Sequence, residues 1–315
     1  MKKFLWILLP LAFLSSGCQS TKYNAAKTII AEQPIHLDNA AAEVIKKEIE
    51  KDRIDSREWL RTNPTSYLAA IDRIDFGQKN MLTVGKADDN DVRLSAPDIE
   101  PHHLKITLEG DRFRVEAAGP KAEFKIKNEA KHQAIVDPSY IQLSRYQLRL
   151  SHQRFPAIIV FDPQSPHFKN YKGVDYFPVD LSYRYELPLT PDSKQEKVTI
   201  LSTRGNRRAA ERIGWFNFYV GEQACRLEAT RLLEPGSGGD SVSVFFRDAT
   251  SGKETYPLGR YVDVLKLKNG KYLLDFNLAY NAACAFSEYY NCPVPPKDNT
   301  LSVAIRAGEK DSHYH

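Results

Sequence analysis

Arg260, Asp275 and Asn277 are the residues whose types and spacing could most readily support ligand chemistry. In the run YLLDFN, strand alternation places Asp275 and Asn277 on one face. A hairpin at Asn269-Gly270 would bring Arg260 beside them, so we expect an Arg260–Asp275 ion pair. This pair would be either a clamp for an anion, since arginine offers a bidentate fork, or a structural pair that pins the following loop. The structural alternative is favoured, because buried charges are mostly paired for structural reasons.

A second possible chemistry is hydrolysis by two carboxyl groups acting as acid and base. The candidates are Asp248, Asp263, Asp275 and Glu309. Glycoside hydrolysis would need two of them about 5–9 Å apart, which strand alternation allows but the spacing does not predict. No serine or cysteine nucleophile with a histidine base is recognisable. Whether the chain is an enzyme is therefore left open.

The first 18 residues, MKKFLWILLPLAFLSSGC, have the pattern of a secretory signal that ends in a lipidation site. Lys2 and Lys3 precede a short apolar run, which small residues separate from Cys18. We expect residues 1–17 to be removed and the Cys18 thiol to be acylated, which would anchor the protein in a membrane. The alternative is an ordinary signal peptide with an incidental cysteine. Because Gln19 is not the aspartate that signals inner-membrane retention, the outer membrane, on its periplasmic side, is the expected location.

Charge and motifs limit the classes of partner. The 44 basic and 40 acidic residues give a formal net charge of +4, and no basic stripe with interleaved aromatic residues is present. This argues against nucleic acid as a partner. The loop PGSGGD, residues 235–240, lacks the Lys-Ser or Lys-Thr pair of a phosphate-binding loop. We predict no cofactor and no metal, and expect contact with a membrane through the lipid and with a small ligand or an envelope protein.

The remaining pattern predicts a mainly β chain with one N-terminal helix. Residues 18–38 are polar and would form a lipid-attached tether. Residues 39–63 have apolar positions at partly helical spacing, and we favour a helix that lies on the folded part over one that lies on a membrane. Residues 64–166 alternate short strands with turns and predict a β-sandwich. Its expected strands are MLTVG (81–85), DVRL (91–94), HLKITL (103–108), RFRVEA (112–117) and FKIK (124–127).

A second antiparallel β domain is predicted for residues 167–309, followed by a tail at 310–315. Its expected strands are KVTIL (197–201), WFNFYV (215–220), CRLEATRL (225–232), SVSVFFRD (241–248), YVDVLKL (261–267), KYLLDFN (271–277) and LSVAIRA (301–307).

The stretch TVGKADDNDVRL followed by PHHLKIT resembles the opening of a forkhead-associated (FHA) domain. That family presents phosphothreonine-binding loops on a β-sandwich. The family's arginine is Lys86 here, its serine–arginine pair is Glu100 and Pro101, and only His103 matches. A carboxylate at position 100 repels a phosphate. We therefore expect an FHA-like sandwich without phosphopeptide binding, in which His102 and His103 have structural or solvated roles.

Several pieces in the C-terminal half resemble closely a bacterial family known as domain of unknown function 1684, and we expect the resemblance to span nearly the whole mature chain from about residue 45. The pieces that carry the resemblance are Asp248, Thr250, Gly252, Thr255, Tyr256, Gly259, Arg260, Asp275, Phe276, Asn277, Cys284, Cys292, Pro295, Pro296, Ala307, Gly308 and Glu309. The family has no established activity, so the resemblance implies none. The residues that we expect to form a ligand patch are Asp248, Thr255, Tyr256, Arg260, Asp275, Asn277, Tyr280 and Glu309.

Cys284 and Cys292 would close a loop of about nine residues in this patch. In an oxidising periplasm, three cysteines beyond Cys18 make one bridge and one leftover thiol. We predict a disulfide between Cys284 and Cys292 that staples the aromatic loop, and a buried free thiol at Cys225. Zinc is disfavoured because no histidine or third cysteine lies near the pair in the sequence. The whole chain is therefore expected to be a lipid-anchored ligand- or partner-binding protein, with an envelope hydrolase as the alternative.

Overall fold

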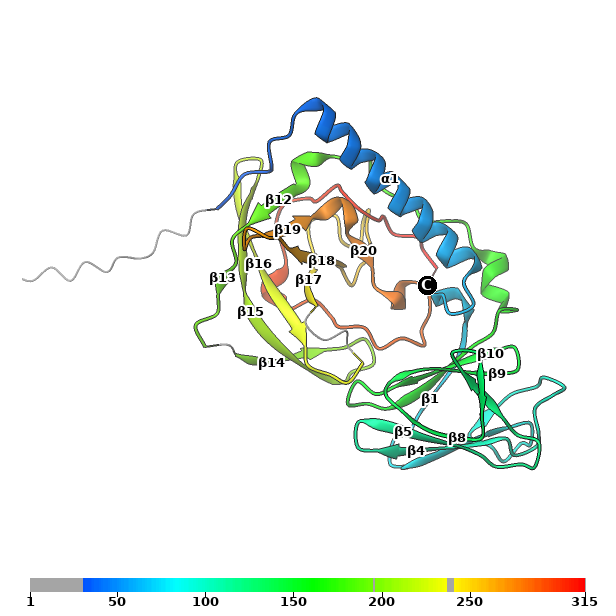
Figure 1. Cartoon of the computed structure of the whole chain (residues 1–315). Helices are drawn as coiled ribbons and strands as arrows, with labels where there is room; N and C mark the ends of the chain where they lie inside the picture. Colours follow the sequence, from blue (N-terminus) through cyan, green and yellow to red (C-terminus); the bar gives the residue numbers. More distant parts are fainter. Residues whose placement is uncertain (1–30, 195, 237–240, 315) are drawn as a thin grey trace, which may run out of the picture. The chain divides into compact units, whose positions relative to one another are not determined.

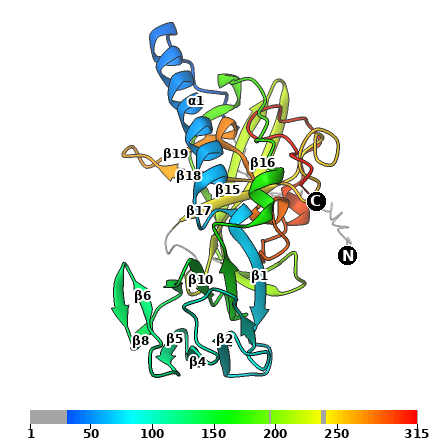
Figure 2. The same cartoon turned by 90° about the vertical axis from the view of Figure 1, so that its right-hand side faces the viewer.

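The computed structural model describes residues 31–194, 196–236 and 241–314, and residue 31 onward forms one compact unit. The predicted signal peptide, Cys18 and residues 18–30 of the predicted tether lie outside these residues. Figure 1 and Figure 2 show the arrangement: one long helix, two small sheets in the N-terminal half, and a large sheet in the C-terminal half. This confirms the predicted mainly β fold, with an FHA-like sandwich followed by further antiparallel strands.

Helix α1 spans Asn39–Thr62 and matches the predicted helix within one residue. Its N-terminus is capped by the Asp38 side chain, which accepts a hydrogen bond from the Ala41 N–H at 2.7 Å. The helix lies on the folded part, because Ile49 and Leu60 are buried and Arg57 donates to the carbonyl of Val174. The favoured interpretation of this helix is therefore confirmed.

Residues 70–161 form a β-sandwich of a six-stranded and a five-stranded sheet, with the orders β1-β11-β10-β9-β6-β7 and β3-β2-β4-β5-β8. Strand alternation explains its core: in β5, Phe113 and Val115 are fully buried, whereas the arginines between and before them are not. The strands are β1 Ala70–Asp75, β2 Met81–Gly85, β3 Val92–Arg93, β4 Leu104–Glu109, β5 Arg112–Ala117, β6 Phe124–Ile126, β7 Glu129–Lys131, β8 Gln133–Val136, β9 Ser139–Leu143, β10 Tyr146–Ser151 and β11 Ala157–Phe161.

The C-terminal domain is built on an antiparallel sheet in the order β12-β19-β18-β17-β16-β15-β13, with β14 on β15 and β20 on β18. Its core is rich in aromatic rings, including Phe216, Phe218 and Phe276, all fully buried. The strands are β12 Arg184–Leu187, β13 Thr190–Pro191, β14 Lys197–Leu201, β15 Arg207–Val220, β16 Gln223–Leu232, β17 Val242–Phe246, β18 Arg260–Lys266, β19 Tyr272–Asp275 and β20 Tyr280–Asn281.

The described residues also contain six short 3₁₀ helices. They are η1 Tyr67–Ala69, η2 Pro166–Asn170, η3 Leu181–Tyr183, η4 Phe276–Leu278, η5 Ala283–Ala285 and η6 Lys297–Asn299.

Two predicted strands take other forms. The run 271–277 is a strand only up to Asp275 and then turns into η4. Residues 301–307 form no strand. The backbone groups of Leu301 and Val303 bond to the backbone of Arg247 and Ala249. Further along, side chains take the backbone bonds: the Ile305 N–H donates to the Asp248 carboxylate, and Arg260 donates to the Ile305 and Ala307 carbonyls. A sequence pattern of alternating apolar residues does not reveal that such side chains will take the backbone bonds of a strand.

Both ends of the described chain are attached to the C-terminal domain. Near the start, the Glu32 N–H donates to the Asn217 carbonyl and the Ile35 N–H donates to the Arg184 carbonyl. Residues 31–38 of the predicted tether are therefore part of the fold. In the predicted tail, the hydroxyl of Tyr314 donates to the carbonyl of Gly173 at 2.9 Å.

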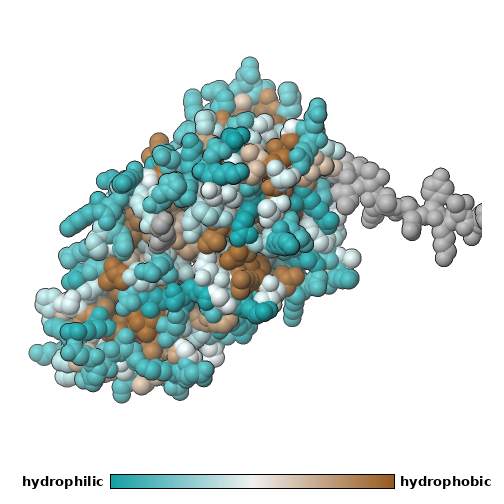
Figure 3. Space-filling model, turned by 180° about the vertical axis from the view of Figure 1, so that it is seen from behind, coloured by the Kyte–Doolittle hydropathy of each residue, from teal (hydrophilic) through white to brown (hydrophobic). Residues whose placement is uncertain are grey.

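The surface seen in Figure 3 is largely hydrophilic, and its apolar residues gather in a few small patches. Within the described residues, no helix has the length and apolar character needed to cross a membrane.

Candidate functional site

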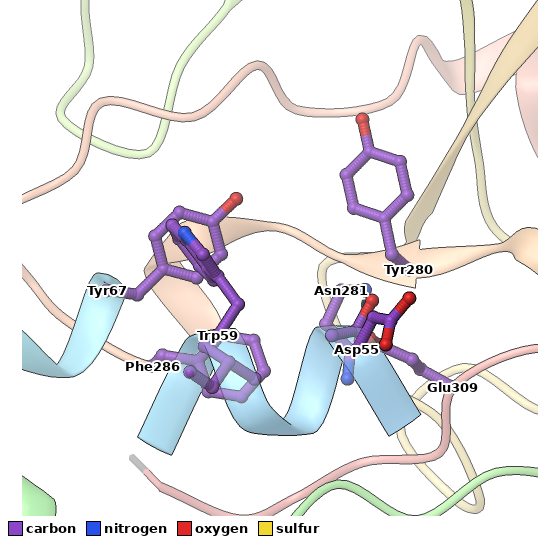
Figure 4. A pocket seen from close by; sticks show the side chains of 9 residues that line it. Asp55, Trp59, Tyr67, Tyr280, Asn281, Phe286 and Glu309 are labelled. Carbon is purple, nitrogen blue, oxygen red and sulfur yellow. Dashed lines mark hydrogen bonds between the residues drawn. The ribbon is translucent and has the colours of Figure 1, made fainter. Parts of the chain in front are cut away.

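A cavity of about 340 Å³ lies between α1 and the C-terminal domain. Its lining comes from one face of α1, from η1, from both residues of β20, and from two later loops (Figure 4). On α1, positions 55, 56, 59 and 60 fall on one side of the helix because residues three and four apart are neighbours. The lining residues are Asp55, Ser56, Trp59, Leu60, Tyr67, Tyr280, Asn281, Phe286 and Glu309.

Three aromatic rings form one wall of this cavity. The ring centroids of Trp59 and Tyr67 are 5.0 Å apart in an edge-to-face contact, and those of Tyr67 and Phe286 are 5.7 Å apart in a stacked one. Figure 4 shows these rings on one side, with Asp55, Asn281 and Glu309 on the other. The cavity thus has an apolar wall that could hold a flat or aliphatic group and a polar wall that could orient it.

Glu309 is the principal ionisable group of the polar wall and is 6% exposed. Its Oε2 accepts from the backbone N–H of Asn281 at 2.7 Å, and its Oε1 accepts from the Tyr176 hydroxyl at 3.3 Å. Burial raises its pKa to about 7, although these two hydrogen bonds and the charge of Arg260 act in the opposite direction. Glu309 can therefore hold or release a proton near neutral pH.

Gly308 sets the position of this carboxyl group. Its φ of +77° is in the left-handed region, and a Cβ there would lie 2.5 Å from the Ala279 carbonyl oxygen and 2.7 Å from that of Phe276. Only glycine fits such a conformation and such a close approach of two backbone segments. The Ala-Gly-Glu sequence thus turns the chain so that Glu309 reaches the cavity.

Tyr176 is held as a donor to Glu309. The guanidinium groups of Arg53 and Arg57 lie 4.8 and 4.7 Å from the centre of its ring, an arrangement typical of cation–π contacts. Burial raises the pKa of Tyr176 well above its ordinary value, so its hydroxyl keeps its proton. Two arginines of α1 therefore pack against the tyrosine that supports Glu309.

Asn281 has one polar atom without a partner. Its side-chain amide nitrogen donates to the carbonyl of Lys310 at 2.8 Å. Its carbonyl oxygen Oδ1 is buried and accepts no hydrogen bond among the described residues. A buried acceptor without a donor is costly, and because Asn281 lines the cavity, a bound molecule could supply the missing donor.

The predicted Arg260–Asp275 ion pair is wrong. Arg260 is 1% exposed and its Nη2 donates to Asp248 at 3.2 Å. The reason is topological: β18 pairs with β19 only through Leu265 and Lys266, and Arg260 instead lies opposite Asn281 of β20. Extending the hairpin register along the whole of β18 missed this change of partner.

Asp275 has a different arginine as its partner. It forms an ion pair with Arg184 of β12, the strand on the other side of β19. Its Oδ1 also accepts from the Asn277 backbone N–H and from the Asn277 side chain, both at 2.9 Å. Asp275 and Asn277 therefore lie together as predicted, but Asp275 caps η4, and the Asn277 side chain accepts from the N–H of Asp180 and donates to its carbonyl.

Asp248 and its threonines form a buried turn. The Asp248 carboxylate accepts from the Thr250 hydroxyl at 2.6 Å, and the hydroxyls of Thr250 and Thr255 are 2.8 Å apart. Asp248 also accepts from Arg260 and from the backbone N–H of Ile305. Because its carboxylate is thus bonded on both oxygens and buried, Asp248 is a structural group.

The two remaining patch tyrosines occupy separate positions. Tyr280 lines the cavity, and its hydroxyl donates to the exposed Asp263 at 3.0 Å. Tyr256 lies near the cysteine pair, with its hydroxyl 3.7 Å from the Cys284 sulfur. Burial raises the pKa of both tyrosines above their ordinary value. Neither is therefore ionised near neutral pH.

Of the eight residues predicted to form a ligand patch, the structure places only Tyr280 and Glu309 at the cavity. Asp248, Thr255, Arg260, Asp275 and Asn277 form the buried frame beneath it. Five further lining residues were not expected from the sequence: Asp55, Trp59, Tyr67, Asn281 and Phe286. The alternation of Trp59 and Leu60 with charged residues on α1 was a signal for a contact face, but it did not show which part of the chain this face meets.

The two cysteines of the predicted disulfide lie in the loop that carries Phe286 of the aromatic wall. Cys284 and Cys292 are both buried free thiols, as is Cys225. The Cys284 backbone N–H donates to the Cys292 sulfur at 3.3 Å. The hydrogen bond between the thiols lowers the pKa of Cys284 and, together with burial, raises that of Cys292. The two thiols are thus adjacent, and the disulfide between them stays a prediction.

The N-terminal sandwich uses His103 as a structural residue. This side chain is 3% exposed, and its Nδ1 accepts from the Glu100 N–H at 3.0 Å. Its Nε2 lies 2.9 Å from the carbonyl oxygen of Glu123. At the predicted phosphate loops, Lys86 donates to the carbonyl of Pro97, and the Glu100 carboxylate accepts from the backbone N–H of Lys121. The expected structural role of His103 is confirmed.

Over residues 31–194, 196–236 and 241–314, no three His, Cys, Asp or Glu side chains gather closely enough to hold a metal ion.

Comparisons with known proteins agree with this division of the chain. The model of the family described as "Protein of unknown function (DUF1684)" matches residues 169–310, and the FHA domain model matches residues 82–144. No curated protein matches.

Two solved structures match part of the chain. One is an uncharacterized protein of Haloarcula marismortui solved by NMR, at 31% identity over 49% of this chain and 85% of that one, with a TM-score of 0.39. The other is Mycobacterium tuberculosis EmbR in complex with a low-affinity phosphopeptide, at 14% identity over 39% of this chain and 31% of that one, with a TM-score of 0.21. By its C-terminal half the chain belongs to the DUF1684 family of proteins of unknown function, here with an FHA-like domain before it.

Proposed function

We propose that this protein is a small-molecule-binding protein of the bacterial cell envelope, anchored through an acylated Cys18 and facing the periplasm. The observation that carries the binding function is the cavity between α1 and the C-terminal domain. It combines three aromatic side chains with a buried carboxyl group whose pKa is about 7. Pockets with an apolar wall and a few oriented polar groups are typical of ligand sites.

The arrangement of the other carboxyl groups supports binding over hydrolysis. Asp248 and Asp275 are each bonded to an arginine and to backbone amides. They are therefore not free to act as acid and base. An envelope hydrolase remains the second candidate, because Glu309 could act as a general acid at its pKa of about 7.

The test of binding is a thermal-shift screen of the full-length protein against periplasmic metabolites, glycans and peptides. We expect at least one compound to raise the melting temperature of the wild type and of Trp215→Leu, but not that of Trp59→Leu. Trp215 is a matched control, because it lies on β15 and stacks on Arg226 at 4.2 Å rather than lining the cavity. A hit that survives Trp59→Leu, or no hit at all, would contradict the proposal.

The anchor is tested separately by growing cells with a radioactive or alkyne-labelled fatty acid. We expect the label on the wild-type protein and its loss in Cys18→Ala. Labelling that persists in the variant would exclude Cys18 as the lipidation site. Incubating extracts of the same cells with an envelope glycan separates the two candidate functions. A hydrolase would release product from the glycan, and Glu309→Gln would abolish that release.

A further inference from the structure

The polar wall of the cavity offers hydrogen-bond acceptors. Asn281 Oδ1 is buried without a donor, whereas the amide nitrogen of the same side chain is already used by Lys310. The Glu309 carboxyl has one protein donor on each oxygen, and a carboxylate oxygen can accept more than one. The Tyr280 hydroxyl already donates its hydrogen to Asp263. Asn281 Oδ1 and the Glu309 carboxyl are thus acceptors left for a ligand, and the hydroxyls of Ser56 and Tyr67 and the indole N–H of Trp59 lie in the same lining.

The charge of the cavity is also of one sign. Among the described residues, Asp55 and Glu309 line it, and no lysine or arginine does. Asp55 is paired with Lys51, whose side chain is 75% exposed and points to solvent rather than lining the cavity. A site lined by carboxyl groups, with a buried acceptor that has no donor, favours a donor of positive charge.

The basic groups close to Glu309 are engaged elsewhere. Arg260 binds Asp248 and three backbone carbonyl groups. Arg53 binds Glu50, and Arg57 donates to a carbonyl and packs on the Tyr176 ring. Asp52, on α1, adds negative charge near the carboxyl group. Within the part of the chain that the structure describes, Glu309 shares the cavity lining with the ionisable side chains of Asp55 and two tyrosines.

We propose that the cavity binds a small organic amine in its protonated form. Its ammonium group donates to Glu309 and to Asn281 Oδ1, and its apolar part lies on Trp59, Tyr67 and Phe286. This inference rests on the proposed binding function and names the chemical class of the ligand. The aromatic wall suits such a ligand twice, because ring faces attract cations as well as apolar groups.

The test compares three ligands of similar shape and different charge. Binding of 2-phenylethylamine, 2-phenylethanol and phenylacetate to the full-length protein is measured by calorimetry at about pH 8, where Glu309 is mostly ionised. We expect the amine to bind about tenfold or more tightly than the alcohol, as one charge-assisted hydrogen bond would provide, and phenylacetate to bind most weakly.

Two variants locate the effect. Glu309→Gln keeps the shape of the side chain and removes its charge, so it should weaken amine binding about tenfold and leave the alcohol nearly unchanged. Glu228→Gln is the matched control, because Glu228 is also a buried carboxyl group with a raised pKa but does not line this cavity. Glu228→Gln should change neither the affinity for the amine nor the affinity for the alcohol.

Proton linkage gives a second readout. As the pH falls below about 7, Glu309 gains a proton and loses its charge. Amine affinity of the wild type should therefore fall, whereas that of Glu309→Gln should stay constant over the same range.

The outcomes are distinct. If the alcohol or phenylacetate binds as tightly as the amine, and Trp59→Leu removes that binding, the cavity is a ligand site but the cation inference is wrong. An amine that binds equally well to Glu309→Gln also overturns the inference. If none of the three binds and the thermal-shift screen gives no hit, the proposed function fails with it.

Discussion

The guanidinium group of Arg260 donates to the Asp248 carboxylate at 3.2 Å, in a place where both side chains are almost excluded from solvent. Burial lowers the pKa of Arg260, but the adjacent carboxylate and the carbonyl groups of Ile305 and Ala307 favour its charged form. This arginine therefore joins the start of β18 to the irregular segment 301–309 that carries Glu309.

Replacing Arg260 by methionine should lower the free energy of unfolding by about 3–5 kcal/mol, since it leaves the Asp248 charge buried without its partner. Urea unfolding of the wild type and the variant measures this difference. The double variant Arg260→Met with Asp248→Asn should be more stable than the single one, because no charge is then left uncompensated. A single variant as stable as the wild type would contradict the structural role of this pair.

Arg306→Ala is the control for Arg260. Its side chain is 59% exposed and pairs with Glu254 at 2.9 Å. Exposed ion pairs contribute about 0–1 kcal/mol, so the urea midpoint should hardly change. A large decrease of the urea midpoint in Arg306→Ala would show that segment 301–309 is sensitive to any change of charge.

Glu309 should make stability depend on pH. Its folded-state pKa of about 7 lies above the ordinary value of 4.5. The folded chain thus holds this proton more tightly, and its contribution to stability is fully present below about pH 4.5 and lost as the pH rises to about 7. The difference approaches about 3 kcal/mol. Glu309→Gln lacks this effect, so its stability relative to the wild type should increase between about pH 5 and 8. Parallel pH profiles for the two proteins would contradict the raised pKa.

Much of this frame could be predicted from local sequence patterns. Strand β14, Lys197–Leu201, and strand β5, Arg112–Ala117, have the predicted bounds because each alternates buried and exposed positions between clear turns. The hairpin at Gly270 follows from Asn-Gly turn chemistry, and its φ is +82°. The end of α1 follows from Asn63-Pro64.

The cavity could not be predicted in the same way, because it joins segments far apart in the sequence. Trp59 and Tyr67 meet Phe286 and Glu309 only after α1 lies on the C-terminal domain. The partner of Arg260 was also hidden, since β18 changes its neighbour from β19 to β20 along its length. Local alternation predicts which face a residue is on, and it does not predict which distant strand lies beside it.

The FHA-like half should not bind phosphothreonine peptides. The carboxylate of Glu100 lies where the family has a donor to phosphate, and Lys86 donates to the carbonyl of Pro97. Titration of a phosphothreonine peptide library, followed by fluorescence anisotropy, should show no saturable binding. The double variant Glu100→Ser with Pro101→Arg is the comparison, because it restores the family's residue pair. Saturable binding by the wild type would overturn this prediction.

Oxidation should join Cys284 to Cys292. Their sulfurs lie on neighbouring segments, with the Cys292 sulfur 3.3 Å from the Cys284 backbone nitrogen. In an oxidising compartment we expect a bridge that stabilises the fold by about 2–3 kcal/mol, through the entropy that it removes from the unfolded chain. The measurement is thiol alkylation of unfolded protein, followed by peptide mass spectrometry, with and without prior reduction.

Without reduction, the label should appear on Cys225 and be absent from Cys284 and Cys292. In Cys284→Ser, the label should return to Cys292, and the urea midpoint should fall toward that of the reduced wild type. Because η5 carries Cys284 two residues before Phe286 of the aromatic wall, reduction should also weaken any ligand that stacks there. Full labelling of both cysteines in protein isolated from the periplasm would show that they remain free thiols.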